Sequence, residues 1–129
     1  MQDFKKLHVW RKAHALALNA HRVAREIRGA SDLSIRSQLV RAAMSIPTNI
    51  VEGRAKASER EFGRFLGYAL SSATELEYHL IACRDLEIIK ESDFRSLVAQ
   101  VIEVRRMIHG LLGRMKTDSS RQGNRSLGR

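Results

Sequence analysis

The stretch RAAMSIPTNIVEG, from Arg41 to Gly53, decides how the chain is expected to fold. Its apolar residues recur three and four apart, as on one face of an α-helix, yet it holds the only proline of the chain. Pro47 has no backbone N–H, so the carbonyl of Ala43 loses its helical partner. We therefore predict a helix that bends or restarts near Pro47, where Ser45, Thr48 and Asn49 are placed to bind the backbone groups that the proline leaves free.

Three further segments share this helical periodicity, each with apolar residues on one face. Short connections separate them, so consecutive helices should be antiparallel neighbours. This pattern predicts an all-α fold, an antiparallel up-down-up-down four-helix bundle that is kinked near Pro47. The predicted helices span residues 7–28, 34–52, 58–86 and 92–115, within one domain of residues 1–116.

The predicted helix ends follow from their capping residues. Gly29 and Gly53 should end the first two helices, because glycine readily adopts the left-handed conformation that follows a helix. Ser58 and Glu61 have the spacing of a capping box at the start of the third helix. The end of the chain, TDSSRQGNRSLGR from Thr117, is polar and basic, and we predict that residues 117–129 form a disordered tail.

Composition narrows the class of protein. The chain has 129 residues, of which 43% are hydrophobic, enough for one domain with a core. Cys83 is the only cysteine, which excludes an intramolecular disulfide, and a reducing cytoplasm is the expected location. No apolar run approaches the length of about 18 residues that a membrane span needs, so no membrane partner is expected.

Positive charge is concentrated near the N-terminus. The net charge is +9, and residues 1–30 hold seven basic and two acidic side chains, whereas residues 58–90 hold four basic and six acidic ones. A basic face of this kind can contact phosphates, although a solvated outer face is the simpler alternative. The candidate nucleic-acid-binding residues are Lys5, Lys6, Arg11, Lys12, Arg22, Arg25 and Arg28.

Motifs that would indicate catalysis were not found in the sequence. Di-iron helix bundles carry Glu-x-x-His pairs, and no glutamate here has a histidine three residues later. No zinc-ligand spacing and no phosphate-binding glycine loop occurs. We therefore predict a protein that is not an enzyme and has no catalytic residues, no metal and no cofactor.

Three motifs together resemble one known family. The opening stretch fits R-A-A-x-S-I-P-x-N-I-x-E-G, FKKLHVWRKA at Phe4–Ala13 fits L-x-V-W-x-x-A, and ALSSATELEYHL at Ala69–Leu80 fits A-x-x-S-x-x-E-x-E-x-x-L. These patterns resemble those of the four-helix-bundle family named after the 23S rRNA intervening sequence. The resemblance covers about Phe4 to Met115, which includes all four predicted helices.

The resemblance implies further expectations. Family members resemble short antiparallel bundles that assemble into ring-like pentamers, so a homo-oligomer is expected. The related accessory proteins of diversity-generating retroelements are similar basic bundles that partner a reverse transcriptase and nucleic acid. The family has no assigned catalytic residues, so none carries over to this chain.

The signature residues are expected to have structural roles. A polar strip of Arg41, Ser45, Asn49 and Glu52 should meet Glu75 or a neighbouring subunit, because polar residues also flank the apolar face of the third helix. The complete set of predicted structural residues is Arg41, Ser45, Pro47, Asn49, Glu52, Gly53, Ser72 and Glu75.

The sequence thus favours a cytoplasmic, non-enzymatic homo-oligomer that binds nucleic acid, with structured RNA preferred, through phosphate contacts on its basic face. The alternative is an oligomeric protein-interaction adaptor whose basic face docks an acidic partner protein. Both functions would use the same charged surface, so the sequence leaves them open.

Overall fold

Four α-helices build this computed structural model, which describes residues 3–127 of the chain and the side chains of residues 3–116. α1 spans His8–Ala24, α2 spans Leu33–Arg54, α3 spans Glu59–Asp85 and α4 spans Glu91–Leu127. Two short 3-10 helices, η1 (Phe4–Lys6) and η2 (Ala30–Asp32), precede α1 and α2. The described residues contain no strand, which confirms the predicted all-α class.

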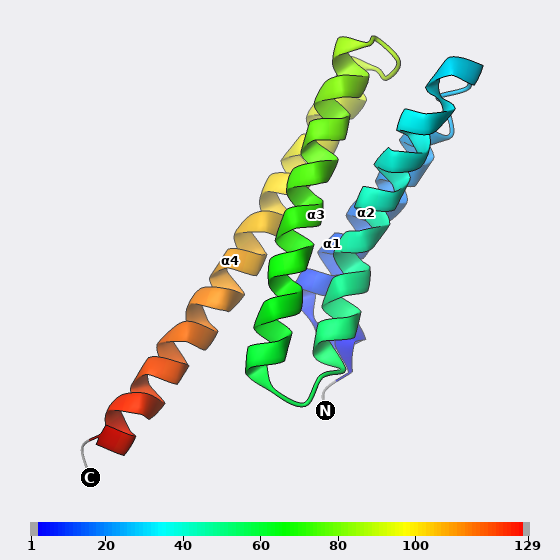
Figure 1. Cartoon of the computed structure of the whole chain (residues 1–129). Coiled ribbons are helices and arrows are strands. Elements are labelled where there is room, and N and C mark those ends of the chain that lie inside the picture. The colour runs from blue at the N-terminus through cyan, green and yellow to red at the C-terminus, as the bar shows by residue number, and fades with distance from the viewer. Residues whose placement is uncertain (1–2, 128–129) are drawn as a thin grey trace.

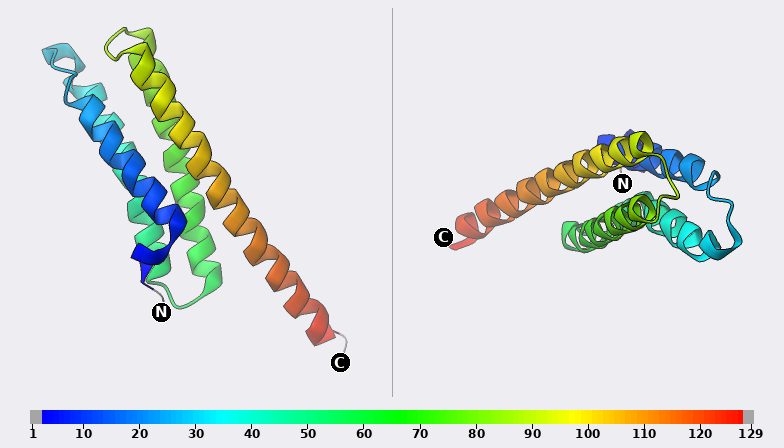
Figure 2. Two further views of the ribbon diagram at one scale, coloured as in Figure 1. Left: turned by 180° about the vertical axis from the view of Figure 1, so that it is seen from behind. Right: turned by 90° about the horizontal axis from the view of Figure 1, so that it is seen from above.

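Successive helices run in opposite directions and pack side by side (Figure 1). α1 and α3 each contact both α2 and α4, and the most extensive packing is between α2 and α3. This arrangement confirms the up-down-up-down four-helix bundle. Towards its C-terminal end α4 diverges from the other helices and projects beyond them (Figure 2).

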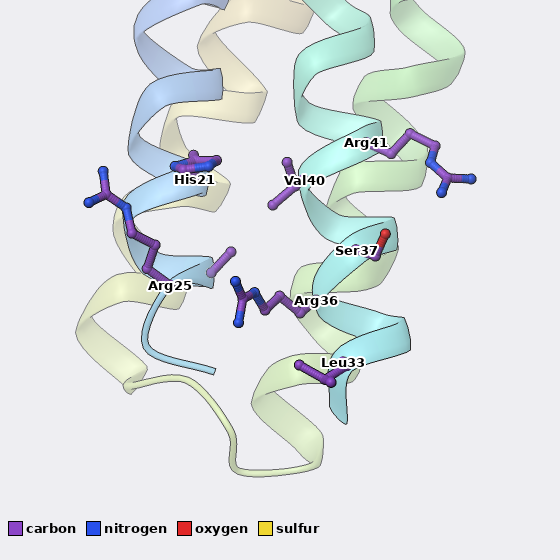
Figure 3. A pocket seen from close by; sticks show the side chains of 8 residues that line it. His21, Arg25, Leu33, Arg36, Ser37, Val40 and Arg41 are labelled. Carbon is purple, nitrogen blue, oxygen red and sulfur yellow. The ribbon is translucent and has the colours of Figure 1, made fainter. Parts of the chain in front are cut away.

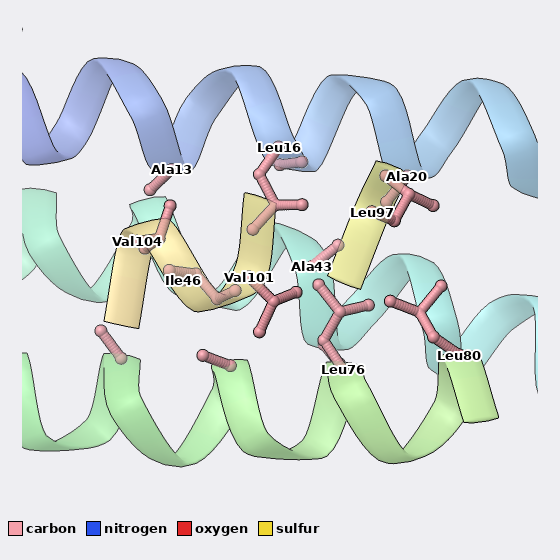
Figure 4. Close-up of a cluster of buried hydrophobic side chains, with 14 of the residues drawn as sticks. Ala13, Leu16, Ala20, Ala43, Ile46, Leu76, Leu80, Leu97, Val101 and Val104 are labelled. Carbon is pink, nitrogen blue, oxygen red and sulfur yellow. The ribbon is translucent and has the colours of Figure 1, made fainter. Parts of the chain in front are cut away.

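All four helices contribute to one hydrophobic core (Figure 4). Leu16, Ile46, Leu76 and Val101 are each fully buried, one from each helix. The buried face of α1 is lined by small residues that let the neighbouring helices approach closely. These residues are Ala13, Ala17, Ala20 and Ala24.

The first helix is shorter than predicted. α1 ends at Ala24, and the backbone N–H groups of Glu26 and Ile27 instead donate to the carbonyls of Val23 and Ala24, three residues back. This tighter turn brings Ile27 into the core, where it is 2% exposed. Gly29 lies beyond the turn with φ of −62°, so it is not the left-handed cap that the sequence predicted.

Gly53 also differs from its predicted role as a helix end. It is buried inside α2, which continues to Arg54, and its φ is not positive. A Cβ atom at Gly53 would lie 2.6 Å from Cβ of Phe65, so the glycine permits a close approach of α2 and α3. α2 runs through Pro47 as one α-helix, so the chain does not restart there, and the kink itself stays a prediction.

The start of α3 is as expected, whereas the end of the chain is not. The Ser58 hydroxyl accepts a hydrogen bond of 3.1 Å from the backbone N–H of Glu61, which confirms this N-cap. A disordered tail was predicted from Thr117, but α4 continues as a helix to Leu127. Once a helix is nucleated, each further residue adds a backbone hydrogen bond at low cost, and no proline stops it here. Residues 128–129 of the predicted tail lie outside the described residues.

Candidate nucleic-acid interface

Four residues of the predicted basic face are exposed to solvent. Lys5 and Lys6 belong to η1, and Nζ of Lys5 lies 3.8 Å from the Asp3 carboxylate. Arg11 lies on the solvent side of α1, and Arg28 lies in the connection between α1 and α2. These side chains are accessible to a ligand, but they do not form one cluster.

Two other predicted residues face α4 and interact with acidic or neutral polar side chains. Nζ of Lys12 lies 3.2 Å from the Glu103 carboxylate of α4. Nη1 of Arg22 donates a 2.8 Å hydrogen bond to Asn19, whose amide in turn donates to Gln100 of α4 at 2.9 Å. The α1–α4 groove beside Arg22 also contains Glu26 and Asp93. The two carboxylates therefore largely balance the positive charge of Arg22 in this groove.

Arg25 faces the opposite side of α1 and lines a groove between the end of α1 and the start of α2, which we call the α1–α2 groove (Figure 3). The groove has a volume of about 500 Å³. Arg36 and Arg41 of α2 and His21 of α1 add three further basic side chains. The complete lining is His21, Ala24, Arg25, Leu33, Arg36, Ser37, Val40 and Arg41.

Arg36 is the most firmly placed of these cations. Its side chain reaches into the space between the two helices, and its Nη1 donates a 3.2 Å hydrogen bond to the Ile27 carbonyl (Figure 3). Arg25 and Arg41 are exposed and extend from the two outer sides of the groove. Within the part of the chain that the structure describes, no aspartate or glutamate lines this groove.

The structure therefore divides the predicted basic face and adds residues to it. Only Arg25 of the seven predicted residues lines the α1–α2 groove. Arg36 and His21 were not predicted as binding residues, and Arg41 was assigned only a structural role. The short connection between the first two helices was the available signal, because it places basic residues before and after it at the same end of the bundle.

The polar strip of α2 meets α3 in part. The hydroxyl oxygens of Ser45 and Ser72 lie 2.8 Å apart and share a hydrogen bond. The amide of Asn49 donates to the Ser45 carbonyl at 2.8 Å and to the Ser45 hydroxyl at 3.0 Å. Arg41 and Glu52, the remaining two residues of the strip, are exposed.

Glu75 does not contact the strip in the way that was expected. Its carboxylate instead lies 3.3 Å from Nε2 of His79, one turn along the same helix. The His79 side chain is only 9% exposed, whereas that of Glu75 is 61% exposed. Contact of the strip with a neighbouring subunit stays a prediction.

Cys83 belongs to the core rather than to a reactive site. Burial raises the pKa of its thiol to about 11, and the negative charge of Asp32 adds to this shift. A thiol in this state is protonated near neutral pH and is a poor nucleophile. The described residues contain no group of three or more His, Cys, Asp and Glu side chains that could hold a metal ion.

A second, apolar groove lies between α1 and the diverging half of α4. Val9 and Leu7 line one side, and Met107 and Leu111 line the other, around a volume of about 450 Å³. The remaining lining residues are His8, Arg106, Gly110 and Arg114. Among the described helices, none is long and apolar enough to cross a membrane.

Comparison with known proteins decides the family. The profile of the 23S rRNA-intervening sequence protein family matches residues 5–110, which include the α1–α2 groove and the Ser45–Ser72 contact. The chain belongs to this family. No curated protein matches it.

A solved structure shows the same fold in another protein. It is a protein of unknown function from the S23 ribosomal protein family of Bacteroides thetaiotaomicron, with 22% sequence identity and a TM-score of 0.73. The match covers 81% of this chain and 97% of that one. This chain and the similar protein therefore share the four-helix bundle fold. The similarity to accessory proteins of diversity-generating retroelements stays a prediction.

Proposed function

We propose that this protein is a cytoplasmic, non-enzymatic homo-oligomer that binds structured RNA through phosphate contacts. The observation that carries the proposal is the α1–α2 groove, which Arg25, Arg36 and Arg41 line without a lining carboxylate. Guanidinium groups bind phosphates with two parallel hydrogen bonds, and such contacts require no base sequence. The family's name, which refers to 23S rRNA, supports RNA as the nucleic acid.

Assembly would strengthen binding through such a surface. Each chain carries a net charge of +9, and a ring-like oligomer, as expected from the family resemblance, would present several grooves to one RNA. Phosphate binding releases counterions, so the affinity should fall steeply as the salt concentration rises. We therefore expect strong binding to folded RNA at low salt and a clear loss of affinity at high salt.

The test compares a hairpin RNA with a duplex DNA of equal length across a salt series, in the presence of excess nonspecific competitor. We expect a linear decrease of log K with log salt concentration, and a preference for RNA that persists with competitor. Equal, weak binding of RNA and DNA that disappears near physiological salt would contradict the proposal, because the charge would then act without selectivity.

The apolar groove between α1 and α4 favours a second candidate function, that of a protein-interaction adaptor. Arg106 and Arg114 flank the apolar side chains of Met107 and Leu111, and this combination suits a partner helix that carries apolar and acidic residues. Replacement of Met107 and Leu111 by aspartate should then abolish co-purification of a partner while leaving RNA binding intact. Loss of RNA binding in this variant would argue against a separate adaptor surface.

A further inference from the structure

We infer that the α1–α2 groove holds one unpaired nucleotide of the bound RNA, with its phosphate on the arginines and its base against the apolar wall. The inference rests on the proposed RNA-binding function and specifies the part of the RNA that is recognised. It starts from the mixed lining of the groove, in which Leu33, Val40 and Ala24 accompany the basic side chains. A surface that bound only phosphates would not need an apolar wall.

The size of the groove suits a single nucleotide. Its volume of about 500 Å³ lies within the range of small-ligand sites, which is about 300–1,000 Å³. A paired base lies inside its helix and cannot enter such a groove. Bases in loops and bulges are unstacked, so they can turn outward and insert between protein side chains.

The apolar part of the groove is accessible to a base. Leu33, at the first position of α2, is a large apolar residue and is 50% exposed. Val40 is partly buried two turns further along, and both side chains face the space between the helices (Figure 3). His21 lies across the groove on α1, where its ring can stack on a base, as aromatic side chains do in other RNA-binding proteins.

The polar part of the groove is suited to the phosphate. Arg36 is held in place by the Ile27 carbonyl through Nη1, and its other N–H groups remain available. Arg25 and Arg41 are exposed on the two rims, so both can turn towards a bound anion. Ser37 adds an exposed hydroxyl that can donate to or accept from a base edge.

The acidic residues nearest in sequence do not line this groove. Glu26 lines the α1–α4 groove on the other side of α1. Asp32 does not line the α1–α2 groove; a Cβ atom added at Gly29 would lie 2.9 Å from its carboxylate, which places Asp32 beside the connection between the two helices. The α1–α2 groove is therefore positively charged on both walls.

The test uses two hairpin RNAs of nearly equal length and charge, each closed by the same non-nucleotide linker in place of a loop, one fully paired and one with a single bulged nucleotide. Wild-type protein should bind the bulged hairpin about tenfold more tightly at the same salt concentration, because only its extra base can insert. Leu33→Ser should reduce this preference to near unity. Leu86→Ser serves as the matched control, because Leu86 is similarly exposed, at 59%, and lies outside the groove.

The outcomes separate this inference from the proposed function. Equal binding of the two hairpins by wild-type protein would overturn the inference and leave RNA binding in place. A preference for the bulge that survives Leu33→Ser would also overturn it, because the base would then bind elsewhere. If neither hairpin binds, the proposed function itself fails. Loss of the preference in Leu33→Ser alone is the result that we expect.

Discussion

At the scale of single residues, Gly53 shows how closely α2 and α3 approach each other. An added Cβ would lie 2.6 Å from Cβ of Phe65 and 3.0 Å from the ring of Phe62, and neither helix can yield without moving its backbone. Overpacking of this kind costs about 1–3 kcal/mol. The requirement for a small residue at this position is therefore steric, and it differs from the capping role that glycine often has at helix ends.

Gly53→Ala should lower the free energy of unfolding by about 1–3 kcal/mol, although alanine is the better helix former. Gly67→Ala is the matched control, because Gly67 lies inside α3 with nothing within 4 Å of its added Cβ. That variant should gain up to about 1 kcal/mol from helix propensity alone. Urea denaturation of both variants measures the difference, and a Gly53→Ala variant as stable as wild type would contradict the close approach.

At the scale of elements, the end of α3 contains a left-handed residue that is not glycine. Glu87 has φ of 59°, and its N–H donates to the Arg84 carbonyl while that of Ile88 donates to the Cys83 carbonyl. These two hydrogen bonds form a Schellman motif, in which glycine is the usual left-handed residue. A side chain in this conformation costs about 1–2 kcal/mol, because its Cβ crowds the following carbonyl oxygen.

Glu87→Gly should therefore raise the free energy of unfolding by about 1 kcal/mol, since it removes that crowding. Glu87→Ala removes the same charge but keeps a Cβ, so its stability should stay close to that of wild type. Thermal unfolding of the two variants side by side distinguishes the backbone effect from the loss of charge. Equal melting temperatures for the glycine and alanine variants would show that the left-handed turn is not strained.

Local sequence patterns predicted the existence and order of the elements but not all of their ends. Apolar spacing found all four helices, and the Ser58 cap followed directly from its spacing to Glu61. Gly29 and Gly53 were misinterpreted as helix ends, because their roles depend on packing against distant residues. Ile27 turns into the core before Gly29, and Phe65 excludes a side chain at Gly53.

At the scale of the whole molecule, the candidate site depends on the tertiary arrangement. Arg25 and Arg36 lie on different helices, so helical periodicity within α1 could not reveal that they line one groove. The same periodicity grouped Arg22 with Arg25, but α1 directs them to opposite sides, towards α4 and α2 respectively. Because α1 lies between α2 and α4, one of its sides lines the α1–α4 groove, whose charges are balanced, and the other lines the positively charged α1–α2 groove.

Binding of RNA by the α1–α2 groove can be distinguished experimentally from binding by net charge alone. The most direct measurement is the salt dependence of hairpin RNA affinity for Arg25→Glu/Arg41→Glu and for a control, Arg60→Glu/Arg95→Glu. Both pairs are exposed, and both substitutions change the net charge equally, but Arg60 and Arg95 lie outside the groove. Light scattering on each variant establishes that the mass of the assembly is unchanged.

We predict that the groove variant loses at least about tenfold in affinity and that the slope of log K against log salt decreases by about two per bound chain. The control variant should stay within about twofold of wild type, because its charges lie away from the bound phosphates. Equal losses in both variants would contradict the account, since net charge alone would then explain the binding.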